Sequence, residues 1–169
     1  MPWYRGPETE RLILRAATVD DAPALYVMNS DPEVMRYTGE PMPASVDVMR
    51  KMIADYPDFE RHGYGRWVCE EKATGEVIGF AGLKYLEDFG EVDVGYRLRR
   101  TWWGRGLATE AARACLDFGF EAIGLEEIVA FVEPENAASV RVAEKLGMQL
   151  AGPFDYDGTP CLRYVRRRR

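Results

Sequence analysis

The sequence predicts a single α/β (α+β) domain built on a mixed, mostly antiparallel sheet of seven strands flanked by about four helices. Two observations lead to this fold class. Three short strand-like segments follow one another closely between residues 65 and 98, as they do in an antiparallel meander. The apolar period then changes to three or four residues from Leu107, and another apolar strand follows at Glu127. That succession is typical of a right-handed β-α-β crossover with one parallel strand pair.

The N-terminal part is expected to contribute one strand and two helices. Residues 11–15, RLILR, alternate polar and apolar side chains as a half-buried strand does. A helix is predicted after Thr18, a candidate N-cap, with Asp20 and Asp21 in its first turn. A second helix, in ASVDVMRKMIADY, has Ser45 as its cap. The segments DPEVMRYTGEPMPAS and FERHGYG are interpreted as loops.

The rest of the chain supplies six strands and two helices. Strands are predicted at residues 65–71, 76–86, 91–98, 127–133, 148–154 and 161–166. One amphipathic helix begins at Leu107. The other has Asn136 as its N-cap and Gly147 just past its last turn.

Composition is that of an ordinary globular protein. A chain of 169 residues suffices for one domain, residues 1–169, with a core at about residues 9–165. A net charge of −6 argues against stable nucleic-acid binding, and the basic tail of residues 166–169 is interpreted as a solvated strand end. No apolar run approaches the roughly 20 residues of a membrane helix, and MPWYRGPETER lacks the apolar region of a signal peptide. We therefore expect a cytoplasmic protein without membrane association, either monomer or homodimer.

Cysteine and histidine offer little catalytic material. Cys69, Cys115 and Cys161 lie far apart, without the close pairing of a zinc site or a disulfide framework. We expect them to be reduced and buried. His62 is the only histidine and is interpreted as a surface residue in a loop. Neither a histidine-dependent hydrolase site nor a metal site is expected.

An anion site is predicted where the strand at residues 91–98 gives way to the next helix. The segment GYRLRRTWWGRGLATEAA places four arginines within residues 97–105 of an acidic protein. A helix N-terminus presents free N–H groups and roughly half a positive charge, so a phosphate binds there if the backbone can come close. Gly104, Gly106 and the small Ala108 permit that approach. Three side chains add positive charge: Arg99, Arg100 and Arg105. A tight turn with solvated arginines is the alternative interpretation.

Two other phosphate motifs fail on spacing. A dinucleotide fingerprint needs a third glycine where Thr109 stands, and no second strand with an acid follows at the usual distance. A Walker A loop needs the sequence Gly-Lys-Ser/Thr, which is absent. What remains is a short glycine turn after an antiparallel meander.

Three segments together resemble the GCN5-related N-acetyltransferase (GNAT) family, in particular the branch that acetylates ribosomal-protein N-termini and spermidine. They are TERLILRAATVDDAPAL, GY…WWGRGLATEA and NAASVRVAEKLGM, they occur in family order, and the resemblance covers nearly all of residues 9–158. The resemblance implies that the strands at residues 91–98 and 127–133 splay apart. It also implies acetyl-coenzyme A as cofactor and transfer of its acetyl group to a primary amine by direct attack in a ternary complex.

The same resemblance implies a set of cofactor contacts. The pyrophosphate would lie on the amides of residues 105–109, and the pantetheine arm would follow VGYRL like an added strand. Gly95 marks a close backbone approach in that strand. Trp103 stands where the wider family has Gln or Arg, which removes one side-chain contact. Asn136 could bond to the pantetheine arm, but its position at the helix start is explained equally well by helix capping. The implied cofactor-binding residues are Tyr96, Arg97, Leu98, Arg99, Trp103, Gly104, Arg105, Gly106, Leu107, Ala108, Thr109, Asn136 and Ser139.

Acetyl transfer to an amine requires a base, an oxyanion donor and a proton donor for the leaving thiolate. Asp93 occupies the acidic position of the branch and Glu91 is the reserve, two residues away on the same strand face. Either residue is alternatively a solvated side chain on an outer face. A main-chain N–H near Tyr96 would meet the oxyanion. The tyrosine of many relatives is Ala143 here, so Ser139 is the implied proton donor, although its place near a helix start also explains it.

The acceptor stays open at this point: protein N-terminus, polyamine, amino acid or aminoglycoside. The resemblance assigns its recognition to residues 31–45 and the final hairpin, where five acids would attract a cation: Asp31, Glu33, Glu40, Asp155 and Asp157. Two other functions remain. Ala143 suggests a non-catalytic acyl-CoA-binding regulatory protein, and the glycine turn alone would suit a nucleotide-binding module.

Overall fold

One sheet runs through the whole molecule in the computed structural model, which describes residues 5–169. The first four residues, part of the segment in which we expected no signal peptide, lie outside the described range. The strands are β1 (Arg5–Glu8), β2 (Leu12–Arg15), β3 (Arg66–Glu71), β4 (Val77–Leu86), β5 (Glu91–Leu98), β6 (Glu127–Val132), β7 (Gln149–Tyr156) and β8 (Thr159–Arg167). The helices are α1 (Ala22–Asn29), α2 (Pro32–Met35), α3 (Val46–Ala54), α4 (Asp58–His62), α5 (Leu107–Phe118) and α6 (Ala137–Lys145).

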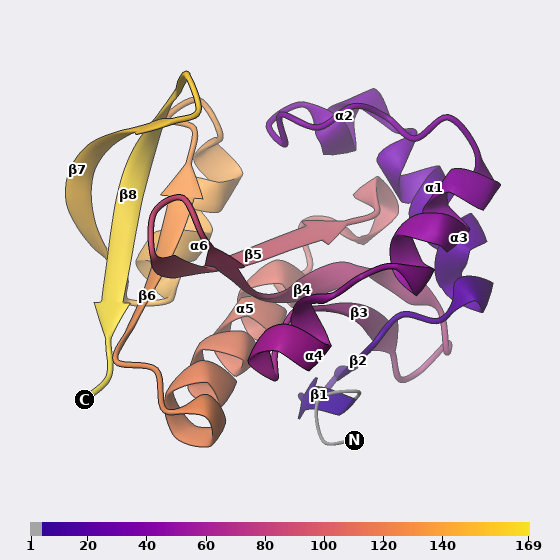
Figure 1. Ribbon diagram of the computed structural model, residues 1–169, viewed down its shortest axis with the longest axis horizontal. Helices are drawn as coiled ribbons and strands as arrows, with labels where there is room; N and C mark the ends of the chain where they lie inside the picture. The colour runs from indigo at the N-terminus through magenta and orange to yellow at the C-terminus, as the bar shows by residue number, and fades with distance from the viewer. Residues whose placement is uncertain (1–4) are drawn as a thin grey trace.

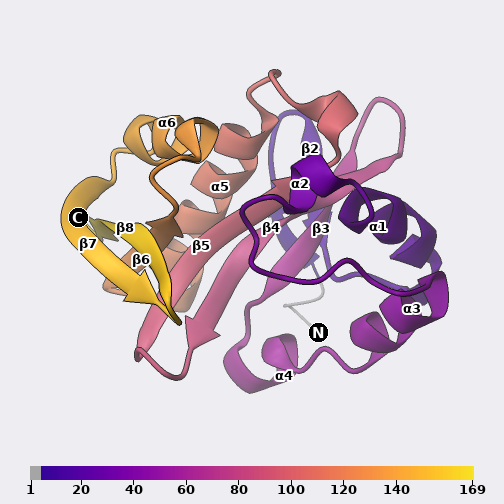
Figure 2. The same cartoon turned by 90° about the horizontal axis from the view of Figure 1, so that it is seen from above.

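The sheet order is β1-β2-β3-β4-β5-β6-β8-β7, and every neighbouring pair is antiparallel except β5 and β6 (Figure 1). The predicted fold class, with its parallel pair joined through α5, is therefore confirmed. Helices α1 to α3 lie on one face of the sheet, and α5 and α6 lie on the other (Figure 2). Within residues 5–169, no helix combines the length and the apolar composition that a membrane span needs.

Two details of the prediction are wrong. The sheet has eight strands because the unpredicted β1 pairs with β2. Its Gly and Pro hide the strand pattern, but a Cβ at Gly6 would lie 2.6 Å from the ring of Trp67, so glycine lets β1 cross that buried side chain. The structure also has two more α-helices than predicted, the short α2 and α4. His62 closes α4 and packs against Tyr64 and Tyr85 instead of lying in a loop.

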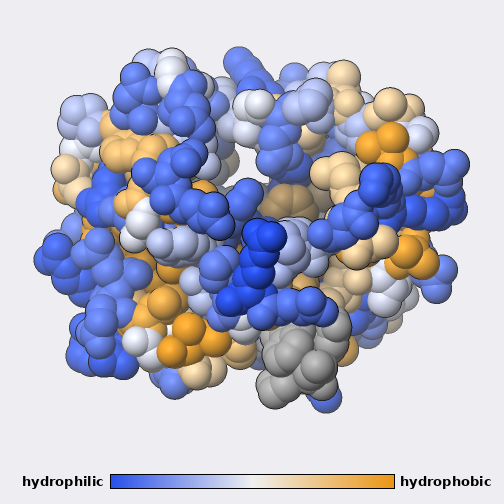
Figure 3. All heavy atoms as spheres, viewed as in Figure 1, coloured by the Kyte–Doolittle hydropathy of each residue, from blue (hydrophilic) through white to orange (hydrophobic). Residues whose placement is uncertain are grey.

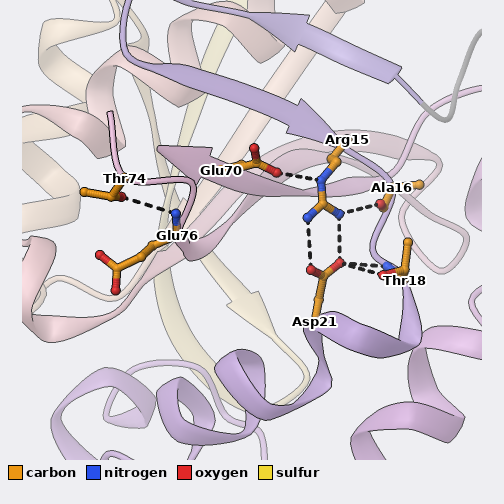
Figure 4. Close-up of polar contacts among 7 residues, drawn as sticks. All are labelled: Arg15, Ala16, Thr18, Asp21, Glu70, Thr74 and Glu76. Atoms are coloured by element: carbon orange, nitrogen blue, oxygen red, sulfur yellow. Dashed lines mark hydrogen bonds and ion pairs between the residues drawn. The ribbon is translucent and has the colours of Figure 1, made fainter. Parts of the chain in front are cut away.

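An ion-pair cluster fastens the start of α1 to the sheet (Figure 4). Arg15 of β2 donates two hydrogen bonds to the buried Asp21, at 2.8 and 3.0 Å, and one to Glu70 of β3 at 3.1 Å. The carboxylate of Asp21 also accepts the N–H of Thr18 at 2.7 Å. Burial alone would raise the pKa of Asp21, but the hydrogen bonds from Arg15 and Thr18 outweigh it and lower that pKa. The cluster thereby fixes where α1 begins.

A gap opens in the middle of the sheet between its two parallel strands. Strands β4 and β5 pair from Gly79–Leu98 to Leu86–Glu91, whereas β5 and β6 pair only at Asp93–Val129. Beyond that point β6 turns away with β8, and the two strands visibly diverge (Figure 1). The surface is hollowed near the middle of the same view, between the β6–β8 side and the α1–α3 side (Figure 3). The splayed central strands are thus part of the fold.

Candidate active site

The first turn of α5 presents main-chain N–H groups beyond the end of β5, where β5 and β6 have parted. Gly106 is the N-cap with a left-handed φ of 76°, and no side chain caps the helix. The N–H of Glu110 bonds to the carbonyl of Gly106 at 3.1 Å. The preceding N–H groups, those of Leu107, Ala108 and Thr109, have no acceptor within the helix. An anion at this place would satisfy them and would gain from the helix dipole.

Arg11, at the end of the loop before β2, adds a positive charge beside this turn. Its guanidinium donates to the carbonyl of Arg105 at 3.0 Å and to the carboxylate of Glu110 at 2.8 Å. Its remaining terminal nitrogen lies 3.7 Å from where a Cβ of Gly106 would be. The first turn of α5 is therefore flanked by a guanidinium that the sequence places far away.

Two of the four arginines within residues 97–105 are engaged elsewhere, and one of them, Arg100, was predicted to add charge to the anion site. Arg97 donates to Asn29 at the end of α1 and to Glu40, both at 3.1 Å. Arg100 pairs with Asp31, the N-cap of α2, at 2.9 Å. These guanidinium groups hold the α1–α2 segment against the sheet, so only the main chain of Arg97 is placed to contact a ligand in the gap.

The other two arginines border the glycine turn more loosely. Arg105 stacks on the ring of Trp102, with its guanidinium 4.6 Å from the ring centroid. Arg99 is 3.9 Å from Glu76, at the limit of an ion pair, on a partly exposed side chain. Both charges remain near the turn, where they add to the potential that an anion meets.

The edge of β5 is open beyond Asp93. Main-chain groups in a strand point alternately to its two sides, and those of residues 94–98 that face β6 have no partner strand within the described chain. An extended ligand arm can bond there as an added strand does. The carbonyl of Leu98 accepts the indole N–H of Trp103 at 2.9 Å, which ties the glycine turn to the end of β5. Trp103 therefore has a structural contact where the wider family has a polar side chain.

The close approach expected at Gly95 is made by a side chain of β3. A Cβ at Gly95 would lie 2.6 Å from the Arg66 guanidinium, which crosses β5 at that point. Arg66 donates to the carbonyl of Gly82 at 2.6 Å and to Oδ1 of Asp93 at 2.9 Å. Because Gly95 has no side chain, the guanidinium of Arg66 can cross β5 at that point and hold Asp93 in place.

The two candidate bases have different surroundings. Arg163 contacts both carboxylate oxygens of Glu91 and also pairs with Glu127 at 3.2 Å. Asp93 is held through Oδ1 alone, and its Oδ2 accepts no hydrogen bond from residues 5–169. Both side chains are largely buried. Asp93 therefore keeps one oxygen for an incoming proton, whereas Glu91 is fully engaged.

Ser139 faces a phenol that the sequence did not predict as its partner. The hydroxyl of Tyr96 donates to Oγ of Ser139 at 3.0 Å. Burial raises the pKa of Tyr96, so the phenol keeps its proton at neutral pH. Because Ser139 accepts this bond, its own hydroxyl proton is free for another acceptor. The side chain of Asn136 accepts the N–H of Ser139 at 3.3 Å, which confirms Asn136 as the N-cap of α6.

Comparison with known proteins agrees with this geometry. The family model described as Acetyltransferase (GNAT) domain matches residues 11–149. The chain belongs to the GNAT acetyltransferase family. The uncharacterized N-acetyltransferase p20 of Bacillus licheniformis is 38% identical over 152 residues, which are 88% of this chain and 85% of p20. The spermidine N(1)-acetyltransferase of Escherichia coli (strain K12) is 26% identical over 161 residues, 89% of this chain and 80% of that enzyme.

A solved structure shows the same architecture. The crystal structure of the acetyltransferase from Agrobacterium tumefaciens str. C58 superposes with a TM-score of 0.81 at 31% identity. The match covers 95% of this chain and 93% of that one. The chain is therefore a GNAT acetyltransferase, and the family resemblance of its sequence motifs is confirmed.

Sequence reasoning missed four side chains at the site of this acetyltransferase. Arg66 and Arg163 hold the two acids of β5, and Arg11 flanks the start of α5. Tyr37, just after α2, donates to the carbonyl of Glu135 at 3.3 Å and so links the α2 side to the turn between β6 and α6. Each acts through a partner more than 25 residues away in the chain, so no local motif marks it.

Proposed function

We propose that this acetyltransferase transfers the acetyl group of acetyl-coenzyme A to a primary amine, which attacks directly in a ternary complex. The observation that carries the proposal is the uncapped, left-handed start of α5 beyond the open end of the gap between β5 and β6. Within residues 5–169, this is the one helix whose N-cap is a left-handed glycine. A diphosphate fits these amides beside Arg11, and an extended arm fits the free edge of β5.

The side chains around the gap would divide the proton transfers between them. A primary amine has a pKa near 10 and is mostly protonated at neutral pH, so it must lose a proton before it attacks. Oδ2 of Asp93 takes that proton directly or through water, while Arg66 keeps the carboxylate in place. A main-chain N–H of β5 near Tyr96 donates to the charge that develops on the carbonyl oxygen. The thioester carbon is the electrophile that acetyl-coenzyme A supplies.

Ser139 is assigned to the leaving sulfur in this proposal, with Tyr96 as its positioning partner. Ser139→Ala should lower kcat about 100-fold, the usual cost of one donor aimed at a developing charge, and leave the KM for acetyl-coenzyme A nearly unchanged. Tyr96→Phe keeps the ring and should lower kcat less, because it removes only the bond that orients the serine. Steady-state kinetics of both variants measure this. A wild-type kcat in Ser139→Ala would leave Ser139 as part of the helix start alone.

The acceptor in this proposal is a small-molecule amine or a protein N-terminus. Two acids expected to attract a cation are engaged, Asp31 with Arg100 and Glu40 with Arg97.

The three cysteines are free and buried, which fits a reducing compartment such as the cytoplasm. We therefore place the proposed amine acetyltransferase in the cytoplasm.

One set of measurements tests the proposed function against its rivals. Acetyl-coenzyme A should raise the melting temperature more than ATP or NAD does, since binding to the folded state stabilises it. Thiol release should then appear with at least one member of a panel of amines and N-terminal peptides. Stabilisation by acetyl-coenzyme A without turnover of any amine would favour the non-catalytic acyl-CoA-binding protein. Stronger stabilisation by ATP or NAD would favour the nucleotide-binding module.

A further inference from the structure

Four aromatic side chains form a compact group on the β6–β8 side of the gap. Phe89 comes from the turn between β4 and β5, Phe131 from β6, and Phe154 and Tyr156 from β7. In five of the six pairs the ring centroids lie 4.5 to 5.9 Å apart, with Phe131 and Phe154 in closest contact. We call these four residues the aromatic wall. All four are half-buried, and none belongs to either hydrophobic core of the described chain. The wall thus leaves apolar ring surface exposed outside the core.

The aromatic wall borders the proposed reaction site. Phe131 lies two residues after Val129, the partner of Asp93 across the parallel pair, so it shares the sheet face of Asp93 just where the strands part. Tyr156 packs on Phe131 with the ring centroids 5.4 Å apart, and burial, followed by the charge of Asp93, raises the pKa of its phenol. A hollow of about 280 Å³ next to Phe154 extends the surface along the final hairpin. A ligand whose amine reaches Asp93 therefore meets these rings.

Charge on this face suits one ammonium group, not several. Glu91 and Asp93 are both paired with arginines, whereas Asp155 alternates with Phe154 and Tyr156 along β7 and so points to the opposite face. Oδ2 of Asp93 is the carboxylate oxygen of β5 that no described side chain holds. A polyamine would bring further positive charges to a surface whose acids on β5 are already neutralised by Arg66 and Arg163.

The spacing of the four rings favours a bound aromatic ring over a bound cation. An aromatic cage holds a cation between rings that stand apart, whereas these centroids are too close to leave such a space. Exposed faces and edges of close-packed rings instead favour another ring in offset or edge-to-face contact. The apolar part of the ligand that fits the wall is therefore flat and aromatic.

We infer that the acceptor is a primary amine joined by a short linker to an aromatic ring, with the ring on the aromatic wall and the amine at Asp93. The inference rests on the proposed acetyl transfer and names its substrate class. The amine nitrogen forms the new bond to the acetyl carbon, the bond from that carbon to sulfur breaks, and the amine proton passes to Asp93. The nitrogen loses a second proton as the amide forms, and a proton reaches the sulfur through the hydroxyl of Ser139, so that coenzyme A leaves as the thiol.

Three commercially available amines test the inference through thiol release at saturating acetyl-coenzyme A. We expect kcat/KM for 2-phenylethylamine to exceed that for spermidine by more than tenfold. It should also exceed that for 2-cyclohexylethylamine by about three- to tenfold, because the saturated ring has similar bulk but cannot make aromatic contacts. Preference for spermidine, or equal rates with the two ring compounds, would overturn the inference and leave the acetyl transfer intact. Turnover of none of the three would overturn the inference, and the proposed acetyl transfer would fall with it only if the panel of amines and N-terminal peptides also gave no thiol release.

Variants of the wall give an independent measurement. Phe131→Leu keeps apolar bulk and should raise the KM for 2-phenylethylamine about tenfold, with the KM for acetyl-coenzyme A unchanged. Phe154→Leu, on the edge strand β7, serves as a second variant should the first fold poorly. Phe120→Leu is the matched control, because Phe120 is a buried ring packed on the α5 side of the sheet. Equal KM values for 2-phenylethylamine in the wild type and in both wall variants would place the ring elsewhere.

Discussion

Asp93→Asn is expected to lower kcat for amine acetylation by about 100-fold or more, the usual contribution of a positioned general base. The amide keeps the size of the carboxylate and still accepts a hydrogen bond from Arg66, but it cannot take a proton at neutral pH. The loss should shrink as the pH rises towards the pKa of the amine, because the free amine then needs no base. Rates measured from pH 7 to pH 10, with acetyl-coenzyme A binding followed by calorimetry, check both parts.

Glu91→Gln is the matched control for this substitution. It makes the same chemical change two residues away on β5, at a carboxylate whose oxygens Arg163 already occupies. We expect a kcat within a few-fold of the wild type and no change in its pH dependence. A large loss in Glu91→Gln together with near-normal activity in Asp93→Asn would exchange the two roles and remove Asp93 from the reaction.

Local signals predicted the parts of the site that depend on local geometry. Ser45 and Asn136 cap their helices as expected, since a cap bonds to an N–H group only a few residues away. The bounds of β5 agree with the alternation in EVDVGYRL, and Gly106 precedes α5 as the glycine turn indicated. The meander and the crossover followed from these patterns, and the anion site stays a prediction that rests on the same glycine turn.

Contacts between distant segments were beyond such reasoning. Arg11 meets Arg105 across 94 positions of sequence, and Arg66 meets Asp93 across 27, so their partners depend on the strand order. The arginines near the glycine turn show the opposite error. Their closeness in the sequence indicated one shared role, but each of them has a different partner in the structure. Arg97 turns to the α1 side of the sheet, where it bonds to Asn29. Arg97 lies within β5, whereas the other three arginines follow the end of that strand, which accounts for the separation.

The aromatic wall illustrates the same limit. Phe89 falls between the predicted strands at residues 76–86 and 91–98, and Phe131 and Phe154 lie within predicted strands, so each alone fits its local pattern. Their contacts appear only when β6, β7 and the turn before β5 meet on one face of the sheet. Specificity in this acetyltransferase is therefore expected to depend on tertiary neighbours, while most of the proposed cofactor contacts come from the continuous segment of residues 96–109.

Gly106→Asp is expected to raise the KM for acetyl-coenzyme A about tenfold or more, with a smaller effect on kcat. The new carboxylate would lie at the N-terminus of α5, bond to the N–H groups that the pyrophosphate needs, and repel its negative charge. Loss of a favourable helix-terminus interaction together with direct repulsion amounts to about 1.4 kcal/mol or more, which corresponds to a factor of ten. Titration of acetyl-coenzyme A at saturating amine measures the KM.

Gly106→Asn separates charge from backbone strain in this experiment. Asparagine has nearly the same size as aspartate and tolerates the left-handed φ of 76° about as well, yet it carries no charge. Strain at this position should therefore be similar in the two variants, and the melting temperatures of the free proteins should agree. A KM raised much more by Asp than by Asn shows that the first turn of α5 binds a polyanion. Equal KM values in the two variants and the wild type would require the pyrophosphate to bind elsewhere, since the amides of residues 107–109 would then be irrelevant to affinity.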